Sequence, residues 1–429
     1  MLLEYNEILD INRVIIAINK LINKHDGLRI NYNRKSQKLY YNEKHSSGIE
    51  AFRYIDLKGF HYDEQCKKVK SLIEKANVSF DIEDSLLFNV TMFDLDDKKQ
   101  ALLFTAHHLV VDGISWRVIL NDFVNILNQL EDGNEITLPM KTHSFKDWAN
   151  ELINYSKKDF EKEMTYWNNI YNSNFNYPID FNKGKDLVKT SQELKEGLDK
   201  DTLNSLMKVV NEIYSIDFNE VLIIALVLAI NNITKNNDVI IELERHGREN
   251  ISKSIDISRT VGWFTSMYPA YFKVESNDIE KNIKSLKEQL RNIPNQGFNY
   301  GTLRFLKKQI DDFQNKLVRF NYLGDLDNII DKEKLNLDNI EFGLESDKEN
   351  ELTALIDIVA MVVNKELKIN ATYSNNKFNK ETIQELLDDY IKILKMIKEK
   401  CIDKDDKEFT PSDFDAVDIS QEDLDALFS

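Results

Sequence analysis

Along the chain, apolar positions switch repeatedly between the period of a helix and the alternation of a strand. From Ile11 to Ile22 they recur every three or four residues, which predicts an amphipathic helix ending near His25–Gly27, where the glycine can form a left-handed cap. Another helix is predicted to start at Ser115, which can serve as its N-cap. The other predicted elements of the first half are helices over residues 63–76, 145–155 and 158–170 and strands over residues 28–32, 39–41, 86–93 and 100–106.

The second half repeats this mixture of patterns. Residues 220–233 are almost uniformly apolar, which predicts a buried helix that is too short to span a bilayer. Asn364-Lys365 is the predicted turn of a hairpin. The other predicted elements are strands over residues 239–243, 267–274, 352–363 and 367–373 and a closing helix over residues 383–397. The pattern as a whole predicts the α/β class with mixed sheets.

The length of 429 residues favours more than one structural unit, since domains average about 150 residues. Residues 171–185, rich in Asn, Asp and Tyr, are a candidate linker. We therefore predict an N-terminal lobe of residues 1–172, a C-terminal lobe of residues 173–401 and an acidic tail or linker of residues 402–429. In that tail, Thr410–Phe414 is expected to be extended, and the chain is expected to lie on the body up to about Ile419.

Composition narrows the range of partners and compartments. The formal charge of -17 argues against a general affinity for nucleic acid or anionic membranes. The two cysteines, Cys66 and Cys401, are too few for a disulfide scaffold or a cysteine-rich zinc site, which favours a reducing cytoplasm. No apolar run reaches 18 residues and Met1 is not followed by a secretory leader, so we expect a cytoplasmic protein that is not in a membrane.

Candidate chemistry first appears at His107–Gly113 (HHLVVDG), where a predicted strand gives way to a turn before a helix. A neutral imidazole is a common general base, and Asp112 with Gly113 can fix the geometry of the turn. Adjacent residues of a strand point to opposite faces, so one histidine should face a cavity and the other should pack inward. A structural histidine pair remains an alternative, and a metal site is disfavoured because no further ligand lies at a suitable spacing.

This segment resembles the HHxxxDG signature of the condensation-domain superfamily of non-ribosomal peptide synthetases. Four further elements resemble those of the family's epimerization domains, in the same order along the chain. They are Ile241–Glu249 (IELERHGRE), similar to EGHGRE with Arg245 for glycine; Asp256–Pro269 (DISRTVGWFTSMYP), similar to DLSRTVGWFTSLYP; Pro294–Gly301 (PNQGFNYG), similar to PNKGxGYG with Gln296 for lysine and Asn299 for glycine; and Phe320–Gly324 (FNYLG). The family's opening segment, with its PIQ-like element, has no counterpart before Leu2–Glu4.

The resemblance implies a two-lobed fold similar to chloramphenicol acetyltransferase, with an active-site tunnel between the lobes. It further implies L-to-D epimerization at the α-carbon of an aminoacyl or peptidyl thioester, carried on the phosphopantetheine arm of a partner carrier domain, without an intrinsic cofactor or metal. On this basis His108 and Glu244 are the expected acid/base pair. The residues expected to shape the site are His107, Asp112, Gly113, Arg259, Asn321 and Tyr322, with Arg259 a possible partner of Asp112.

Burial is expected to raise the pKa of Glu244 toward neutrality, which would suit acid/base work. Neighbouring synthetase modules are the expected partners of the C-terminal tail. Two alternatives remain open: an amide-forming condensation or acyltransferase domain, in which His108 would matter and Glu244 would not, and a catalytically silent module that only docks a carrier protein.

Overall fold

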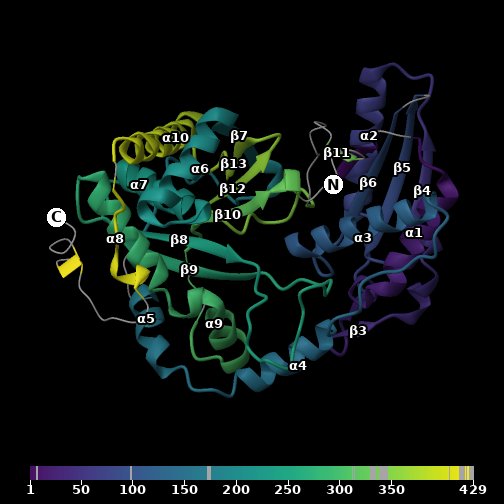
Figure 1. The fold of residues 1–429 in the computed structure, drawn as a ribbon, viewed down its shortest axis with the longest axis horizontal. Coiled ribbons are helices and arrows are strands. Elements are labelled where there is room, and N and C mark those ends of the chain that lie inside the picture. Colours follow the sequence, from purple (N-terminus) through teal and green to yellow (C-terminus); the bar gives the residue numbers. More distant parts are fainter. Residues whose placement is uncertain are drawn as a thin grey trace. The chain divides into compact units, whose positions relative to one another are not determined.

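The computed structural model describes residues 1–5, 8–96, 99–171, 175–311, 313, 315–328, 335–337, 346–404, 406–414, 421 and 423–424. Its packing defines two compact units (Figure 1). Unit 1 consists of Met1–Lys157, His246–Thr265 and Asp327–Asn350. Unit 2 consists of Lys158–Arg245, Ser266–Leu326 and Glu351–Ser429. The predicted lobes were contiguous in sequence, whereas each unit gathers separate segments of the chain.

Unit 1 is built on a five-stranded sheet with the order β11-β1-β6-β5-β4, in which β4 and β5 are parallel and the other pairs are antiparallel. A separate hairpin pairs β2 with β3. The strands are β1 (Leu2–Tyr5), β2 (Ile30–Asn33), β3 (Lys38–Tyr41), β4 (Phe52–Asp56), β5 (Phe88–Asp96), β6 (Lys99–Ala106) and β11 (Leu335–Leu337). The helices are α1 (Ile11–Lys24), α2 (Tyr62–Asn77), α3 (Gly113–Glu131) and α4 (Phe145–Tyr155).

Alternating side chains give the sheet of unit 1 two hydrophobic faces. Leu2 and its cross-strand partner Leu103 belong to the cluster that contains the apolar residues of α2. Leu3 and its partner Leu102 point the other way, into the larger cluster formed with α1 and α3. Figure 1 shows α1 and α3 side by side in this unit. Because the strands bury both faces, their sequences are more uniformly apolar than those of a strand with one wet face.

Unit 2 contains a six-stranded mixed sheet with the order β7-β13-β12-β10-β8-β9. The central strand β10 is parallel to both β8 and β12, and the remaining pairs are antiparallel. The strands are β7 (Ser191–Leu198), β8 (Asp238–Arg245), β9 (Ser266–Lys273), β10 (Val318–Asp325), β12 (Ile356–Val363) and β13 (Glu366–Ser374). The helices are α5 (Glu161–Tyr171), α6 (Lys200–Tyr214), α7 (Phe218–Thr234), α8 (Ile279–Arg291), α9 (Phe298–Gly301) and α10 (Lys380–Ile402).

Helix α7 is the core helix of unit 2. Every residue from Val221 to Ile230 is buried, and the helix packs against α6, α8, α10 and β8. A reciprocal capping box between Asp217 and Glu220 starts it, and Lys235 in the left-handed conformation ends it. No single described helix is long and apolar enough to cross a membrane, although α6 and α7, bent by 94°, would pass that test as a pair on length and composition.

The helices and strands predicted from the hydrophobic pattern are confirmed, with small shifts of their ends, as is the mixed α/β class. The turn at Asn364-Lys365 is also confirmed, since both residues have positive φ angles. Two caps were predicted wrongly. Asp112 rather than Ser115 caps α3, because its carboxylate accepts the Ser115 amide. Gly27 has no left-handed conformation.

The glycine at position 27 is instead explained by a close approach of two backbones. A Cβ atom there would lie 2.0 Å from the carbonyl oxygen of Val261, in a later segment of unit 1. Because that oxygen belongs to the main chain, no side-chain rotation could relieve the overlap. The position therefore requires a residue without a side chain.

The candidate linker and the C-terminal tail both pack on the protein in the parts that the structure describes. From Phe175 to Lys185 the candidate linker is part of unit 2, with Phe175 and Tyr177 buried and the amide of Asp180 bonded to the carbonyl of Lys377. In the tail, the extended path predicted for Thr410–Phe414 is wrong, because Pro411–Asp413 forms a 3₁₀ turn. Residues 415–420 lie outside the described part, so the prediction for Ile419 stays a prediction.

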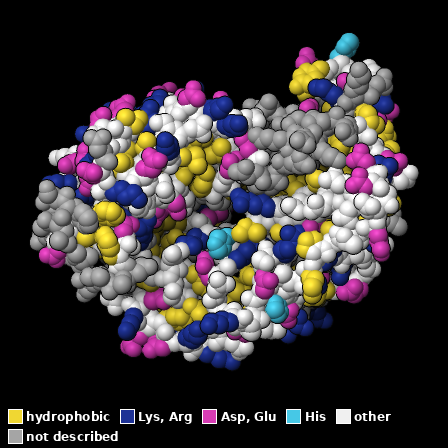
Figure 2. Space-filling model, viewed as in Figure 1, with side chains coloured by type: hydrophobic (Ala, Val, Ile, Leu, Met, Phe, Trp, Pro, Cys, Tyr) yellow, Lys and Arg dark blue, Asp and Glu magenta, His cyan; other side chains and the backbone are white. Residues whose placement is uncertain are grey.

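On the face shown in Figure 2, acidic and basic side chains are interspersed over each unit.

Candidate functional site

The loop that carries the histidine pair lies between β6 and α3 in unit 1. It begins directly after Ala106, with the amide of His107 bonded to the carbonyl of Leu87 and the amide of Val110 bonded to the carbonyl of His107. Val110 and Val111 are buried in the larger hydrophobic cluster of the unit. These two valines hold the loop on the core while the residues before them reach the surface.

The two histidines lie just beyond the strand in different environments, and the prediction that one of them faces a cavity stays a prediction. His107 is half-buried, its ring contacts Phe80 edge-on, and its Nδ1 accepts the amide of Leu109, while burial lowers its pKa. His108 is exposed, with its Nδ1 3.2 Å from the carbonyl oxygen of Val111. A carbonyl only accepts, so this contact places the proton on Nδ1 and leaves Nε2 as a base.

Trp263 lies next to His108 in unit 1. The two ring centroids are 6.3 Å apart, and Trp263 is 45% exposed, which is unusually high for a tryptophan. The tryptophan follows the buried Val261 and Gly262, which anchor its segment. An exposed aromatic ring beside a basic imidazole nitrogen provides an apolar wall next to a group that can move a proton.

Asp112 is almost completely buried and fixes this loop to a later segment of the chain. Its carboxylate accepts hydrogen bonds from the amide of Ser115 at 2.7 Å and the amide of Phe264 at 3.1 Å. Nη2 of Arg248 lies 2.9 Å from Oδ1 and 3.0 Å from Oδ2 of the same carboxylate. The side chains of Asp112 and Arg248 are 2% and 5% exposed. The prediction that Arg259 pairs with Asp112 is therefore wrong, and Arg248 takes that place.

The two terminal nitrogens of Arg248 and the face of its guanidinium all make contacts within unit 1. Its Nη1 donates to the carbonyls of Ile257 and Thr260, its Nη2 also reaches the hydroxyl of Ser115, and its guanidinium stacks 4.0 Å from the ring centre of Phe264. Burial lowers its pKa from the usual arginine value. The hydroxyl of Ser115 completes the junction, because it donates to the carbonyl of Gly262 and accepts the amide of the same residue.

Arg259 forms a second junction, further along α3. It pairs with the fully buried Asp122 of α3, whose other oxygen lies 2.9 Å from Nε2 of His25. Two arginines eleven positions apart thus bind two carboxylates at either end of the first three turns of α3. Together they hold residues 246–265, including Trp263, against the histidine loop.

The third predicted residue of the loop, Gly113, has no evident steric reason to be glycine. It is the first residue of α3, its φ angle is not positive, and a Cβ atom there would meet no neighbour within 4 Å. Nothing in the structure explains a site-shaping role for this residue.

Glu244 lies near the end of β8 in unit 2, on the polar face of the sheet. Parallel pairing sets Arg319 beside Glu242 and Phe320 beside Leu243, so Asn321 comes next to Glu244. Leu243 and Phe320 are buried on the opposite face. The strand alternation therefore delivers a carboxylate and an amide to the same position from segments 77 residues apart.

Hydrogen bonding and burial both act on Glu244. The amide of Asn321 donates to Oε2 at 2.6 Å, and Nε of Arg319 is 3.8 Å from Oε1 but only 2.6 Å from Oε2 of Glu242. The side chain of Glu244 is 17% exposed. Burial raises its pKa to about 7, against the opposing effect of Arg319. The carboxyl group can therefore both give and accept a proton near neutral pH.

Tyr322 does not join this cluster, because the next residue of β10 points to the other face. Its ring contacts Phe218 at the start of α7, with the ring centres 5.7 Å apart. This contact ties the strand of Asn321 to the core helix. His108 belongs to unit 1 and Glu244 to unit 2, so the proposal that they act on one substrate stays a prediction.

The turn Pro294–Gly297 (η5) and the helix α9 that follows it hold two residues that depart from the family's pattern, Gln296 and Asn299. Asn295 and Gln296 have positive φ angles of 43° and 51°. The side-chain amides of Asn295 and Asn299 both donate to Oε1 of Glu163 at 2.8 Å. Asn299 is fully buried, so the amide that replaces the family's glycine is part of a built polar contact.

No group of three or more His, Cys, Asp or Glu side chains among the described residues could hold a metal ion. His108 in unit 1 carries an imidazole and Glu244 in unit 2 carries a carboxyl group, two kinds of side chain that can transfer protons. Sequence reasoning missed Arg248 and Glu163. Arg248 was visible in the HGRE run, but nothing in a single sequence distinguishes it from Arg245 or Arg259 as the partner of Asp112, and Glu163 carried no signal.

A family model for the condensation domain matches residues 1–420. Surfactin synthase subunit 1 of Bacillus subtilis (strain 168) is 33% identical over 429 residues, which covers 97% of this chain but only 12% of that protein. The crystal structure of the epimerization domain from the third module of tyrocidine synthetase B matches with a TM-score of 0.83 and 32% identity, over 94% of this chain and 91% of that one. The first condensation domain of the CDA synthetase, at 14% identity and a TM-score of 0.67 over 92% and 89% of the two chains, has the same chloramphenicol acetyltransferase-like fold. The chain belongs to the condensation domain family.

Proposed function

We propose that this protein epimerizes the α-carbon of an aminoacyl or peptidyl thioester that a carrier domain delivers on its phosphopantetheine arm. The observation that carries the proposal is Glu244, a buried carboxyl group that Asn321 orients and whose pKa burial raises to about 7. An amide-forming enzyme of this family has no evident need for such a group. The likeness to an epimerization domain at 32% identity supports the same reading.

The reaction requires a base on one face of the α-carbon and an acid on the other. One group removes the α-proton, the electron pair moves into the thioester carbonyl to give an enolate, and the second group returns a proton to the opposite face. No electrons are gained or lost, and no further reactant is consumed. We assign these roles to His108, through Nε2, and to Glu244, with the direction of each left open.

The expected partners follow from the substrate. A peptidyl carrier domain supplies the thioester, and neighbouring synthetase segments attach through the C-terminal tail, as the long synthetases among the relatives suggest. No intrinsic cofactor is part of the proposal, since the thioester carbonyl itself accepts the charge that a cofactor would otherwise take.

The test is a chirality and exchange assay on a loaded carrier. A carrier bearing an L-aminoacyl thioester is incubated with the protein in D₂O, the thioester is hydrolysed, and the D-to-L ratio and α-deuterium content are measured. Wild type should produce D-isomer and incorporate deuterium. Glu244→Gln should lose at least about a hundredfold in one direction of exchange, the usual contribution of an acid/base residue.

Glu242→Gln is the matched control, because Glu242 lies two residues earlier on the same face of β8 and bonds to Arg319. It should keep most of the activity. Equal exchange in wild type and Glu244→Gln would contradict the assignment of this residue.

An amide-forming condensation domain is the second candidate, favoured by the family match and by the synthetases among the relatives. It predicts peptide-bond formation when a second loaded carrier is added, lost in His108→Ala and retained in Glu244→Gln. A protein that binds the carrier but catalyses neither reaction would be a docking module.

A further inference from the structure

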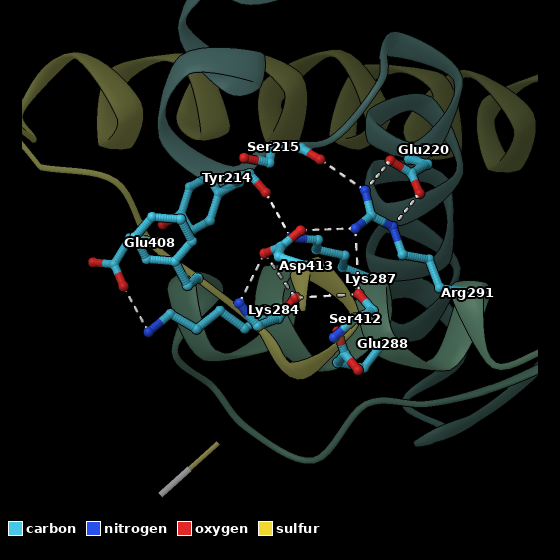
Figure 3. Close-up of polar contacts among 12 residues, drawn as sticks. Tyr214, Ser215, Glu220, Lys284, Lys287, Glu288, Arg291, Glu408, Ser412 and Asp413 are labelled. Atoms are coloured by element: carbon cyan, nitrogen blue, oxygen red, sulfur yellow. Dashed lines mark hydrogen bonds and ion pairs between the residues drawn. The ribbon is translucent and has the colours of Figure 1, made fainter. Parts of the chain in front are cut away.

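The chain around Asp413 is held in unit 2 by a compact group of charged and polar side chains, which we call the tail clamp: Glu220, Lys287, Arg291, Ser412 and Asp413 (Figure 3). Asp413 lies in the 3₁₀ turn Pro411–Asp413, and both cations lie on α8. Nζ of Lys287 is 2.7 and 2.6 Å from the two oxygens of Asp413, and Nη1 of Arg291 is 2.9 Å from Oδ1. The clamp thus joins the tail to one helix.

The burial of these charges shows that the clamp is part of the fold. The side chain of Lys287 is completely buried, and apart from Asp413 its ammonium donates to the carbonyl of Tyr214. Burial lowers the pKa of Lys287, whereas this ammonium lowers the pKa of Asp413 against the effect of burial. A buried ammonium left without its carboxylate is strongly unfavourable, so the tail is held in place while unit 2 is folded.

Arg291 connects the clamp to the core as well as to the tail. Its Nε and Nη2 donate to the two oxygens of Glu220 at 2.8 and 3.1 Å, and Nη2 also donates to the carbonyl of Ser215. Glu220 belongs to the first turn of α7. Arg291 is the last residue of α8, so these bonds fix the point at which the helix ends.

The chain leaving that point forms the η5 turn after only two residues. In η5, Asn295 and Gln296 have positive φ angles, which cost energy in residues other than glycine and persist only where their surroundings hold them. Gly297 follows with φ of 83°, and a Cβ atom there would lie 2.3 Å from the ring of Tyr268, so the turn lies flat against that ring. Its path therefore depends on where α8 ends.

Tyr268 carries this dependence to the candidate catalytic strand. It lies on β9, which pairs with β8 so that Tyr268 is opposite Leu243 and Met267 is opposite Glu244. Tyr268 also contacts Trp167, which in turn contacts Tyr300 of α9, the short helix that follows η5. A continuous set of contacts thus runs from Asp413 through α8 and η5 to the strand beside Glu244.

We propose that Asp413 is a positioning residue: by fixing the end of α8 it holds the η5 turn against β9 and thereby sets the position of Glu244. The proposal rests on the proposed function for its catalytic consequence only. It would make the catalytic side of unit 2 sensitive to the segment through which the chain continues beyond the clamp.

The test compares full-length Asp413→Asn with Glu408→Gln. Glu408 is the matched control because it lies in the same tail and loses the same charge, but it pairs with Lys284 and Lys404, away from the end of α8. Hydrogen–deuterium exchange is measured over residues 266–273 and 293–301, together with kcat and KM on the loaded carrier at a temperature where each variant is folded.

Asp413→Asn should speed exchange in both segments and lower kcat about threefold to thirtyfold, with KM nearly unchanged, whereas Glu408→Gln should change neither. If Asp413→Asn does not fold, Arg291→Lys keeps the charge but loses the forked contact and should show a smaller change in the same direction. Unchanged exchange over residues 293–301 in the variant that folds would overturn the proposal. Faster exchange in a protein with no epimerase activity would support the clamp and reject the proposed function instead.

Discussion

Replacing Asp112 with asparagine tests whether the buried junction with Arg248 stabilises unit 1. The two oxygens of the carboxylate each face donors: Oδ1 accepts Ser115 and Arg248, and Oδ2 accepts Phe264 and Arg248. An asparagine places an NH₂ group at one of these positions in either orientation. Asp112→Asn therefore removes the charge that pairs with Arg248 and directs two donors at each other.

The expected cost is large because both partners are buried. Leaving one member of a buried ion pair uncompensated costs about 3–5 kcal/mol. For a unit of about 200 residues, each kcal/mol lowers Tm by roughly 2–4 °C, so the transition of unit 1 should fall by roughly 6–20 °C. Activity should fall as well, because Asp112 follows the valine whose carbonyl orients His108.

Differential scanning calorimetry measures this effect directly. Asp84→Asn is the control, since it removes the same charge from the pair with Lys44, whose two side chains are largely exposed. Exposed pairs contribute little, so this variant should melt close to wild type. If Asp112→Asn also melts within a degree or two of wild type, the buried pair of Asp112 and Arg248 does not stabilise unit 1.

Two further predictions concern stability alone. Because the folded pKa of Glu244, about 7, exceeds its ordinary value of 4.5, the folded protein holds a proton that the unfolded chain has lost, so stability should fall as pH rises through this window. Glu244→Gln should remove this pH dependence, and its free energy of unfolding at pH 8 should exceed that of wild type by at most about 3 kcal/mol. Urea unfolding of both proteins at pH 5 and pH 8 measures this difference. Gly27→Ala should destabilise unit 1, because its methyl group would overlap the carbonyl of Val261, whereas Gly113→Ala meets no neighbour; equal melting temperatures for these two variants would contradict that reading.

The elements predicted from the hydrophobic pattern are those whose buried residues repeat clearly along the chain, whereas β4, β7, α6 and α8 were not among the predicted elements. The period of apolar residues in α1 and the unbroken apolar run of α7 both identify helices, and both are buried as expected. Asn321 was predicted only as a site-shaping residue, through the family resemblance; the pairing of β8 with β10 gives the physical reason for its contact with Glu244. The local sequence therefore predicts where helices and strands form and which side chains share one face of a strand.

What the sequence alone did not predict depends on contacts between distant segments. Asp112 and Ser115 are both good caps, and the choice between them is made by Gly262, which engages the hydroxyl of Ser115. The partner of Asp112 could be selected only once residues 246–265 had been placed on α3. The glycine at position 27 has the same explanation, since its neighbour lies more than two hundred residues away in the chain.

The divided sequence of unit 1 has a consequence for the order of events during synthesis. The cations that neutralise Asp112 and Asp122 lie 136 and 137 positions further along the chain. At 5–20 residues per second, a ribosome needs roughly 7 to 27 seconds to make that stretch. During this time the arginines that pair with Asp112 and Asp122 have not yet been synthesised. Most of the first segment of unit 2, including β8, is made in the same interval. The N-terminal unit should therefore finish folding only after much of its neighbour has left the ribosome, which would leave its nascent core open to chaperones for that interval.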